Sequence, residues 1–219
     1  MKTVQKIVND LLKESPFIED GLTDGYINLT ALAKVFQPKI EKISGKPVQK
    51  GAIVMAIKRY NSSYGTAMHH RKVSDYIKNL GDIIIRTNLV DFTFKNSAKL
   101  LNKHQELLVH INENPTIFHA SSKGVYETNI VTCSSMSTKI SQLFQDEKMI
   151  SRIDDLASLT MRLPIDYFCI PGIFYIIFKK IASENINIIE LISTTNEFTI
   201  IIDQKEINKA FDVLQNLKN

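Results

Sequence analysis

One order of local patterns occurs twice in this chain, and it restricts the possible folds more than any other feature. A β-like run, a helical pattern, two β-like runs and a second helical pattern follow one another over residues 82–145, and again over residues 156–217. The two copies differ in sequence, so the repeat is one of structure. Strands joined by helices on one face indicate an α+β sandwich.

A ferredoxin-like βαββαβ unit is the fold that this order predicts for each copy. Such a unit needs a fourth strand, and the second copy shows only three β-like runs before its last helical pattern. The β-like run at 82–87 is therefore the candidate to supply that strand. A short β-like run at 149–153 follows the first copy. The predicted boundaries are 82–153 for the first unit and 154–219 for the second.

Short helical patterns fill the chain before this repeat. One amphipathic pattern precedes Pro16, which is expected to end it. Asn28 is expected to cap a second helix, Pro38 to begin a third piece that ends at Gly45, and Pro47 to open the last pattern. These patterns predict a small helical bundle over residues 1–65, joined to the repeat by a linker helix over 66–81.

The bundle is compatible with a helix-turn-helix, although any small helical bundle shows similar periodicity. In that interpretation its last helix would enter the major groove of DNA, and basic residues after it would contact phosphates. The candidate DNA-binding residues are Gln49, Lys50, Lys58, Arg59, Arg71 and Lys72.

Charge is unevenly distributed along the 219 residues. Residues 1–80 contain 13 Lys and Arg against 7 Asp and Glu, a net charge of +6, whereas the rest of the chain carries −2. A basic front and a near-neutral back indicate two parts with different partners. The first residues lack the apolar run of a signal peptide, and no apolar stretch is long enough to span a membrane. Cys133 and Cys169 form no metal or redox motif, so the expected location is the cytoplasm.

The stretch from Ile170 to Asp203 combines a loop, a helix and a β-hairpin. Pro171 and Gly172 stand directly before the helical pattern. The first N–H groups of a helix have no partner within the helix, so they attract a small anion such as a carboxylate. Gly172 would allow close approach, and Asn187 could both donate and accept hydrogen bonds. The alternative is that Pro171 and Gly172 only make a tight entry to the helix.

Several segments of the second copy carry a family resemblance. They are Pro171-Gly172-Ile173 at the helix start, Phe178 and Ile181 within the helix, Ile186-Asn187-Ile188 and Ile192-Ser193-Thr194 around one strand, and 198–202 in the next. With them, residues 156–217 resemble the ACT domains of aspartokinases. The whole chain more loosely resembles uncharacterised archaeal proteins with an N-terminal helical domain and a tandem ACT pair, on segments 27–33 and 51–60.

The resemblance implies an amino-acid site at the interface of paired domains. The implied ligand-binding residues are Asp166, Cys169, Ile170, Pro171, Gly172, Ile173, Asn187, Ile188 and Thr194. In the first copy, Phe94-Lys95-Asn96-Ser97 replaces the Pro-Gly entry, so that copy is expected to complete the sheet rather than to bind ligand.

The sequence contains no phosphate loop and no nucleophile–histidine–carboxylate spacing, so an enzyme is not expected. His104, His110 and His119 lie singly in the sequence and are expected to be structural. No cofactor and no metal are predicted. The function expected first is a ligand-responsive, DNA-binding transcriptional regulator with the ACT pair as its sensor. The alternative is a regulatory subunit or protein-interaction module for an amino-acid biosynthetic enzyme. Exposed sheet edges favour a homodimer or higher oligomer.

Overall fold

The computed structural model of the chain describes residues 2–61, 73, 75–164 and 171–218. Its contacts divide it into two compact units, Met1–Lys72 and Val73–Asn219, each with its own apolar core. Among the described residues, every helix is too short or too polar to span a bilayer.

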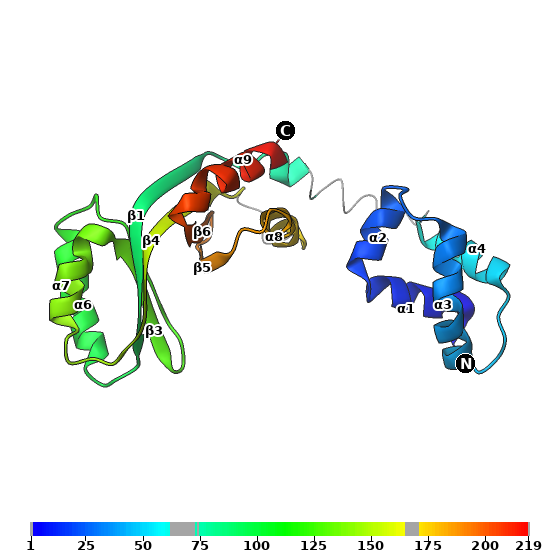
Figure 1. The fold of residues 1–219 in the computed structure, drawn as a ribbon, viewed down its shortest axis with the longest axis horizontal. Coiled ribbons are helices and arrows are strands. Elements are labelled where there is room, and N and C mark those ends of the chain that lie inside the picture. Colours follow the sequence, from blue (N-terminus) through cyan, green and yellow to red (C-terminus); the bar gives the residue numbers. More distant parts are fainter. Residues whose placement is uncertain (1, 62–72, 74, 165–170, 219) are drawn as a thin grey trace. The chain divides into compact units, whose positions relative to one another are not determined.

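Four helices make up the described part of the first unit, here called the helical unit: α1 Val4–Lys13, α2 Pro16–Thr23, α3 Leu29–Ser44 and α4 Lys50–Asn61 (Figure 1). Apolar side chains at helical spacing point inward from these helices and form one core. Its fully buried members include Val8, Leu12, Ile40, Ile53 and Ile57.

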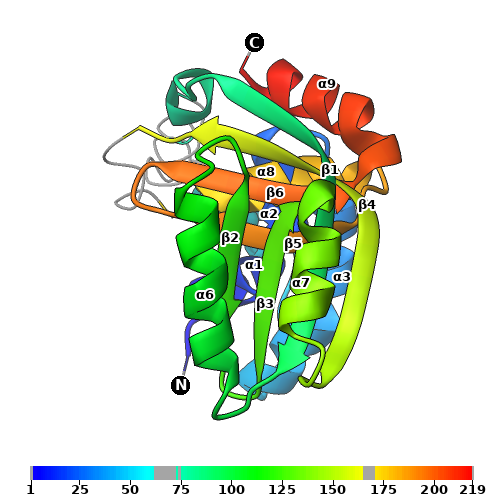
Figure 2. The ribbon, with the colours of Figure 1, turned by 90° about the vertical axis from the view of Figure 1, so that its left-hand side faces the viewer.

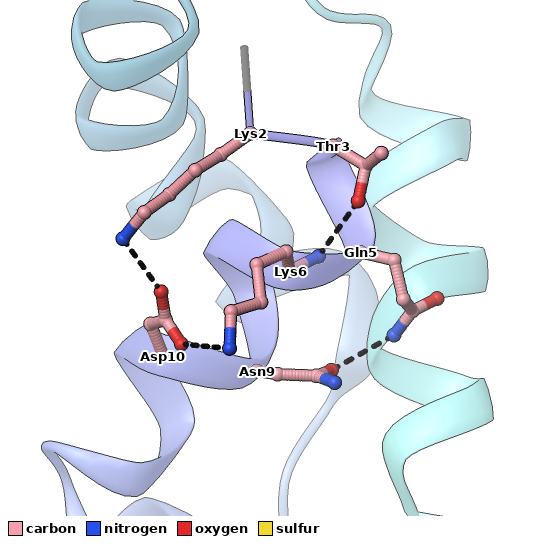
Figure 3. A network of polar contacts seen from close by, with 6 residues as sticks. All are labelled: Lys2, Thr3, Gln5, Lys6, Asn9 and Asp10. Atoms are coloured by element: carbon pink, nitrogen blue, oxygen red, sulfur yellow. Dashed lines mark hydrogen bonds and ion pairs between the residues drawn. The ribbon is translucent and has the colours of Figure 1, made fainter.

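Polar contacts hold the start of α1 (Figure 3). The Thr3 hydroxyl accepts a hydrogen bond from the Lys6 N–H, which satisfies one of the open donors of the first turn. The Asp10 carboxylate pairs with Lys2 at 3.0 Å and with Lys6 at 3.5 Å. Gln5 Nε2 donates to the carbonyl oxygen of Ala56, so α1 is also tied to α4.

The roles of two prolines were only partly predicted. The first helix ends at Lys13, before Pro16 as expected, but Pro16 also begins the unexpected helix α2, where its missing N–H costs no hydrogen bond. Pro38, expected to begin a separate piece, lies inside the unbroken helix α3. Phe36 and Ile40 on either side of it are both buried, so packing outweighs the local cost of the proline. Three expected helical pieces between residues 28 and 61 are therefore two helices.

The predicted ends of α3 are confirmed. The Asn28 side chain accepts hydrogen bonds from the N–H groups of Thr30 at 2.9 Å and Ala31 at 3.0 Å. Gly45 ends the helix in the left-handed region with φ 68°, a conformation that favours glycine.

The second unit, here called the sheet unit, begins with helical residues at 73 and 75–78 and then follows the predicted order. A single six-stranded sheet runs through it in the order β2-β3-β1-β4-β6-β5. The elements are β1 Ile83–Lys95, α6 Leu100–Asn112, β2 His119–Lys123, β3 Glu127–Cys133, η1 Ser134–Met136, α7 Ser137–Leu143, β4 Met149–Arg162, α8 Ile173–Ser183, β5 Ile188–Ser193, β6 Glu197–Asp203, η3 Gln204–Glu206 and α9 Ile207–Leu217.

The two central strands are longer than expected. The β-like runs at 82–87 and 90–95 are one strand, β1, and those at 149–153 and 156–163 are one strand, β4. Each strand has one residue with positive φ at its middle, Asn88 at 57° and Asp155 at 55°. These residues mark irregularities in the ladder between β1 and β4, beyond which regular pairing resumes. The boundary expected between residues 153 and 154 falls inside β4.

Antiparallel pairing of β1 with β4, at the centre of the sheet, gives each half of the sheet one additional strand segment. Residues 83–86 pair with 158–161, as proposed for the missing fourth strand, and residues 91–94 pair with 149–153. We call the segments 89–95 and 149–153 with β2, β3, α6 and α7 the first half. The segments 83–86 and 156–162 with β5, β6, α8 and α9 are the second half.

Helices cover one face of each half. Figures 1 and 2 show α6 and α7 beside β1 and β3, where Phe92, Phe94 and Ile130 are fully buried. The predicted apolar positions of α9 are also confirmed, with Ala210 and Leu214 in the core of the second half.

The helix-free faces of the two halves are turned toward each other. Leu89, Val131, Leu156 and Ile201 form one buried cluster there. Phe118 and Ile192 pack against the same cluster, although they belong to opposite ends of the strand order. The sheet therefore bends so that residues near its two edge strands meet.

Candidate functional site

The predicted ligand site at the start of α8 keeps the geometry that an anion requires. Gly172 precedes α8 with φ 101°, a conformation open mainly to glycine, and no side chain of the described residues caps the helix. The Gly172 carbonyl accepts from the N–H of Ile176 at 3.2 Å, so the helix begins directly after it. Pro171 and Gly172 are exposed. The first N–H groups of α8 therefore face outward at the positive end of the helix.

The first turn of α8 is fixed on β6. Ile173 is buried, and the ring centroids of Phe174 and Phe198 are 4.7 Å apart. Ile173 thus anchors the turn instead of facing a ligand. The predicted site residues Asp166, Cys169 and Ile170 lie outside the described residues.

The remaining predicted ligand residues divide between two ends of α8. Thr194 follows β5 in the hairpin where Phe198 pairs with Ser193, so it lies toward the start of α8. Ile188 begins β5, and Asn187 directly precedes it, only a few residues after α8 ends. The eleven residues of α8 rise about 17 Å. One chain therefore does not bring Gly172 and Asn187 together.

A polar network on the helix-free face was missed at the sequence level. Asn129 Nδ2 donates to Asp91 Oδ1 at 2.6 Å and to Glu190 Oε1 at 3.1 Å. Asp91 is only 3% exposed, although a charged residue between Val90 and Phe92 in an alternating strand is typical of a solvent face. Alternation within a strand does not indicate which faces of the sheet pack against each other. The packing of the two helix-free faces is what brings the residues of this network together.

Burial changes the proton affinity of both carboxyl groups. Burial, together with the charge of Glu190, raises the pKa of Asp91 to about 6, although the hydrogen bond from Asn129 opposes the shift. Burial also raises the pKa of Glu190, against a lowering by the Leu191 backbone N–H. These carboxyl groups hold their protons at a higher pH than exposed ones do.

Two histidines that lie singly in the sequence, and were expected to be structural, lie together in the structure. His104 Nε2 on α6 and His119 Nε2 on β2 are 3.5 Å apart. Burial and the neighbouring His104 lower the pKa of His119 to about 4. The ring is therefore neutral near pH 7. No group of three or more His, Cys, Asp or Glu suited to a metal ion occurs in the described part of the chain.

The candidate DNA-binding residues of the helical unit are at its surface. Gln49 directly precedes α4, and Lys50, Lys58 and Arg59 lie on it; all four are exposed. The loop before α4 is held by Glu41, which accepts from the Val48 N–H at 3.0 Å. Arg71 and Lys72 lie outside the described residues.

Comparison with known proteins gives a fold and no sequence family. No family model matches the chain, and no curated protein matches it. The regulatory subunit of aspartate kinase from Thermus thermophilus matches over 64% of this chain and 99% of that chain, with 10% identity and a TM-score of 0.51. The aspartokinase alpha and beta subunits match over 63% of this chain and 97% of that chain, with 14% identity and a TM-score of 0.50.

Aspartate kinase from Clostridium acetobutylicum matches over 64% of this chain with 13% identity and a TM-score of 0.52. That match spans 34% of the kinase, so the chain corresponds to about a third of it. The helical unit, residues 1–72 of 219, is too small to account for a match of this extent, which must include much of the sheet unit. The likeness shows the α+β, antiparallel-sheet fold of aspartate kinase regulatory, ACT-type domains.

Proposed function

We propose that the protein is a regulatory protein whose sheet unit binds an amino acid. The observation that carries the proposal is the match to 99% of a regulatory subunit of aspartate kinase. A regulatory role needs a ligand site and a second part whose behaviour the ligand changes. The sheet unit offers the first, and the helical unit, with its separate core, offers the second.

Within the sheet unit we propose two ACT-like units, 82–153 and 154–219, that arose by duplication. The matching irregularities at Asn88 and Asp155, each at the middle of a long central strand, support this division. In the proposal the second unit holds ligand at the start of α8, and the first unit completes the sheet.

A second copy of the chain is part of the proposed site. The rise of α8, about 17 Å, lies between Gly172 and the chain that leads to Asn187, so a ligand touching both residues needs Asn187 from another molecule. We therefore propose a homodimer or higher oligomer with ligand at its interface. Sedimentation of the full chain with and without ligand tests this, and a ligand that leaves a monomer monomeric contradicts it.

The test of amino-acid binding is a thermal-unfolding screen of the full chain with each of the twenty standard L-amino acids. A ligand that binds only the folded state raises the melting temperature. Asn187→Ala is expected to weaken the binding event at the α8 site, and Asn216→Ala, an exposed asparagine on α9, is the matched control. Absence of any shift with all twenty contradicts the proposed function.

The output that we propose first is a protein partner, such as an amino-acid biosynthetic enzyme. The helical unit exposes large apolar side chains that a monomer does not need at its surface. They include Tyr26 at 84%, Val35 at 66%, Ile43 at 53% and Met55 at 51%.

DNA is the second candidate output, favoured by the exposed basic residues of α4. A gel-shift experiment at low salt tests it, because phosphate contacts are strongest there. A Lys50→Ala, Lys58→Ala double variant should weaken a real complex, whereas Lys34→Ala on α3 should change it little. No complex even at low salt argues for the protein partner.

A further inference from the structure

A cleft of about 280 Å³ lies between the helix-free faces of the two halves. Its polar second-half lining is Arg86, Thr160, Thr194, Glu197 and Thr199, and Ala120 closes it from the first half. The volume is just under the lower end of the range usual for small-molecule sites. A molecule of amino-acid size fits such a space.

The cleft exists because one position differs between the two halves. Ala120 and Glu190 each lie three residues before the end of an edge strand, β2 or β5. Each stands opposite a residue of the central apolar cluster, Ala120 opposite Val131 and Glu190 opposite Ile201. Glu190 fills the space over the first half with its own carboxylate, whereas the methyl group of Ala120 leaves the matching space open.

The space over the first half, which Glu190 fills, shows that a carboxylate can occupy this position. There the Glu190 carboxylate accepts a hydrogen bond from Asn129 at 3.1 Å, beside Asp91. Ile153 pairs with Asp91 in that half, so no cation faces the carboxylate from the neighbouring strand.

The open space has the opposite charge pattern. Arg86 pairs with Ser158 in the register, at the position that corresponds to Ile153. The Arg86 guanidinium lies 5.7 Å from the Phe118 ring centroid, and no carboxylate among the described residues forms an ion pair with it. A guanidinium stacked on a ring keeps its N–H groups available for a carboxylate.

Two threonine hydroxyl groups also line the cleft. Thr160 Oγ1 and Thr199 Oγ1 are 2.8 Å apart, and either can be the donor. Ser158, the register partner of Arg86, is fully buried and does not line the cleft, and its Oγ has no hydrogen-bond partner among the described residues. His119 also lines the cleft and has a buried Nδ1 without a partner in the described part. Buried polar groups of this kind normally have a partner.

We propose that this cleft is a second ligand site, which binds a small zwitterion of amino-acid type with its carboxylate on Arg86 and its ammonium toward Glu197. The proposal rests on the proposed function. The cleft shares Thr194 with the predicted ligand residues but is not lined by Gly172 or Asn187. In this proposal the ligand carboxylate lies against the second half at the position that corresponds to the Glu190 carboxylate against the first half. Glu197 lines the same cleft and supplies the negative charge that a zwitterion needs.

The experiment is calorimetric titration of the full chain with each L-amino acid that raises its melting temperature. Arg86→Ala should weaken one binding event about 10- to 100-fold, the loss expected for a hydrogen bond to a charged group. Ala120→Glu places a tethered carboxylate in the cleft and should abolish that event. Glu197→Gln should weaken the binding of the amino acid. It should not weaken the binding of the same acid without its amino group.

Two matched variants define specificity. Lys95→Ala removes an exposed cation from the other end of β1, and Asn187→Ala changes the α8 site; both should leave the cleft event unchanged. Should Ala120→Glu fail to fold, Arg86→Ala and Glu197→Gln decide alone, since both residues are exposed.

The outcomes separate the two proposals. Binding that Arg86→Ala and Glu197→Gln leave unchanged overturns the cleft site and leaves the proposed function standing. No binding of any amino acid to the wild-type chain overturns both.

Discussion

Asp91 is the residue at which burial and charge conflict most strongly. The residue is 3% exposed, its carboxyl group receives one hydrogen bond from Asn129, and the carboxyl group of Glu190 lies nearby. Its pKa in the folded chain is about 6, against an ordinary value of 3.8. Between these pH values the folded state keeps a proton that the unfolded state has released. Stability therefore falls as pH rises through this window, and the full cost is present above about pH 6.

Asp91→Asn removes this titration and keeps an oxygen that can accept from Asn129. The stability of the variant relative to wild type should increase by about 3 kcal/mol between pH 4 and pH 7, since one pKa unit corresponds to about 1.4 kcal/mol. Denaturant unfolding at each pH measures it. The lowered pKa of His119 acts in the opposite sense, but it is common to both proteins and cancels. Asp212→Asn, at an exposed position on α9, is the control, and an unchanged pH profile for Asp91→Asn contradicts the argument.

At the scale of elements, α3 is a helix that keeps a proline for reasons of packing. Pro38 is exposed, and it removes the N–H that would bond to the Lys34 carbonyl. The helix persists because Leu32, Ala33, Phe36 and Ile40 are all buried on one face. Tertiary contacts thus override a local signal that predicts a break.

Pro38→Ala should stabilise the helical unit by about 1–3 kcal/mol, because it restores a backbone hydrogen bond and removes a steric clash. Hydrogen exchange of α3 amides in the full chain measures this. Pro47→Ala, before α4 and outside any helix, is the control and should change protection little. Equal or lower protection of α3 in Pro38→Ala shows that the proline geometry is required.

Periodicity and capping predicted most elements, because they depend on residues close in sequence. Asn28 and Gly45 mark the ends of α3 as expected, and the alternation in 90–95 marks a strand. The continuity of β1 and β4 was not predictable in this way. Asn88 and Asp155 resemble turn residues locally, and only the pairing between the two strands keeps the chain extended through them. The cleft and the Asp91 network were missed for the same reason, since they depend on contacts between the two halves.

At the scale of the whole sheet unit, β1 and β4 make the two halves one structure. β1 and β4 pair with each other near both of their ends. Each half therefore contains a segment of both strands. Leu89 and Leu156 are register partners at the centre, and each is 1% exposed. They pack with Val131 of the first half and Ile201 of the second. The two halves should therefore unfold together.

Leu156→Ala tests this shared core. Removing a buried leucine side chain should cost about 2–5 kcal/mol, and the loss should lower hydrogen-exchange protection in β3 and β6 alike. Leu107→Ala is a second and more remote test of the coupling, because Leu107 is fully buried in the core of the first half alone. If the halves are coupled through β1 and β4, Leu107→Ala also lowers protection in β6. Protection in β6 that survives both substitutions means that the halves unfold independently, and a ligand between them would then have no single rigid site to bind.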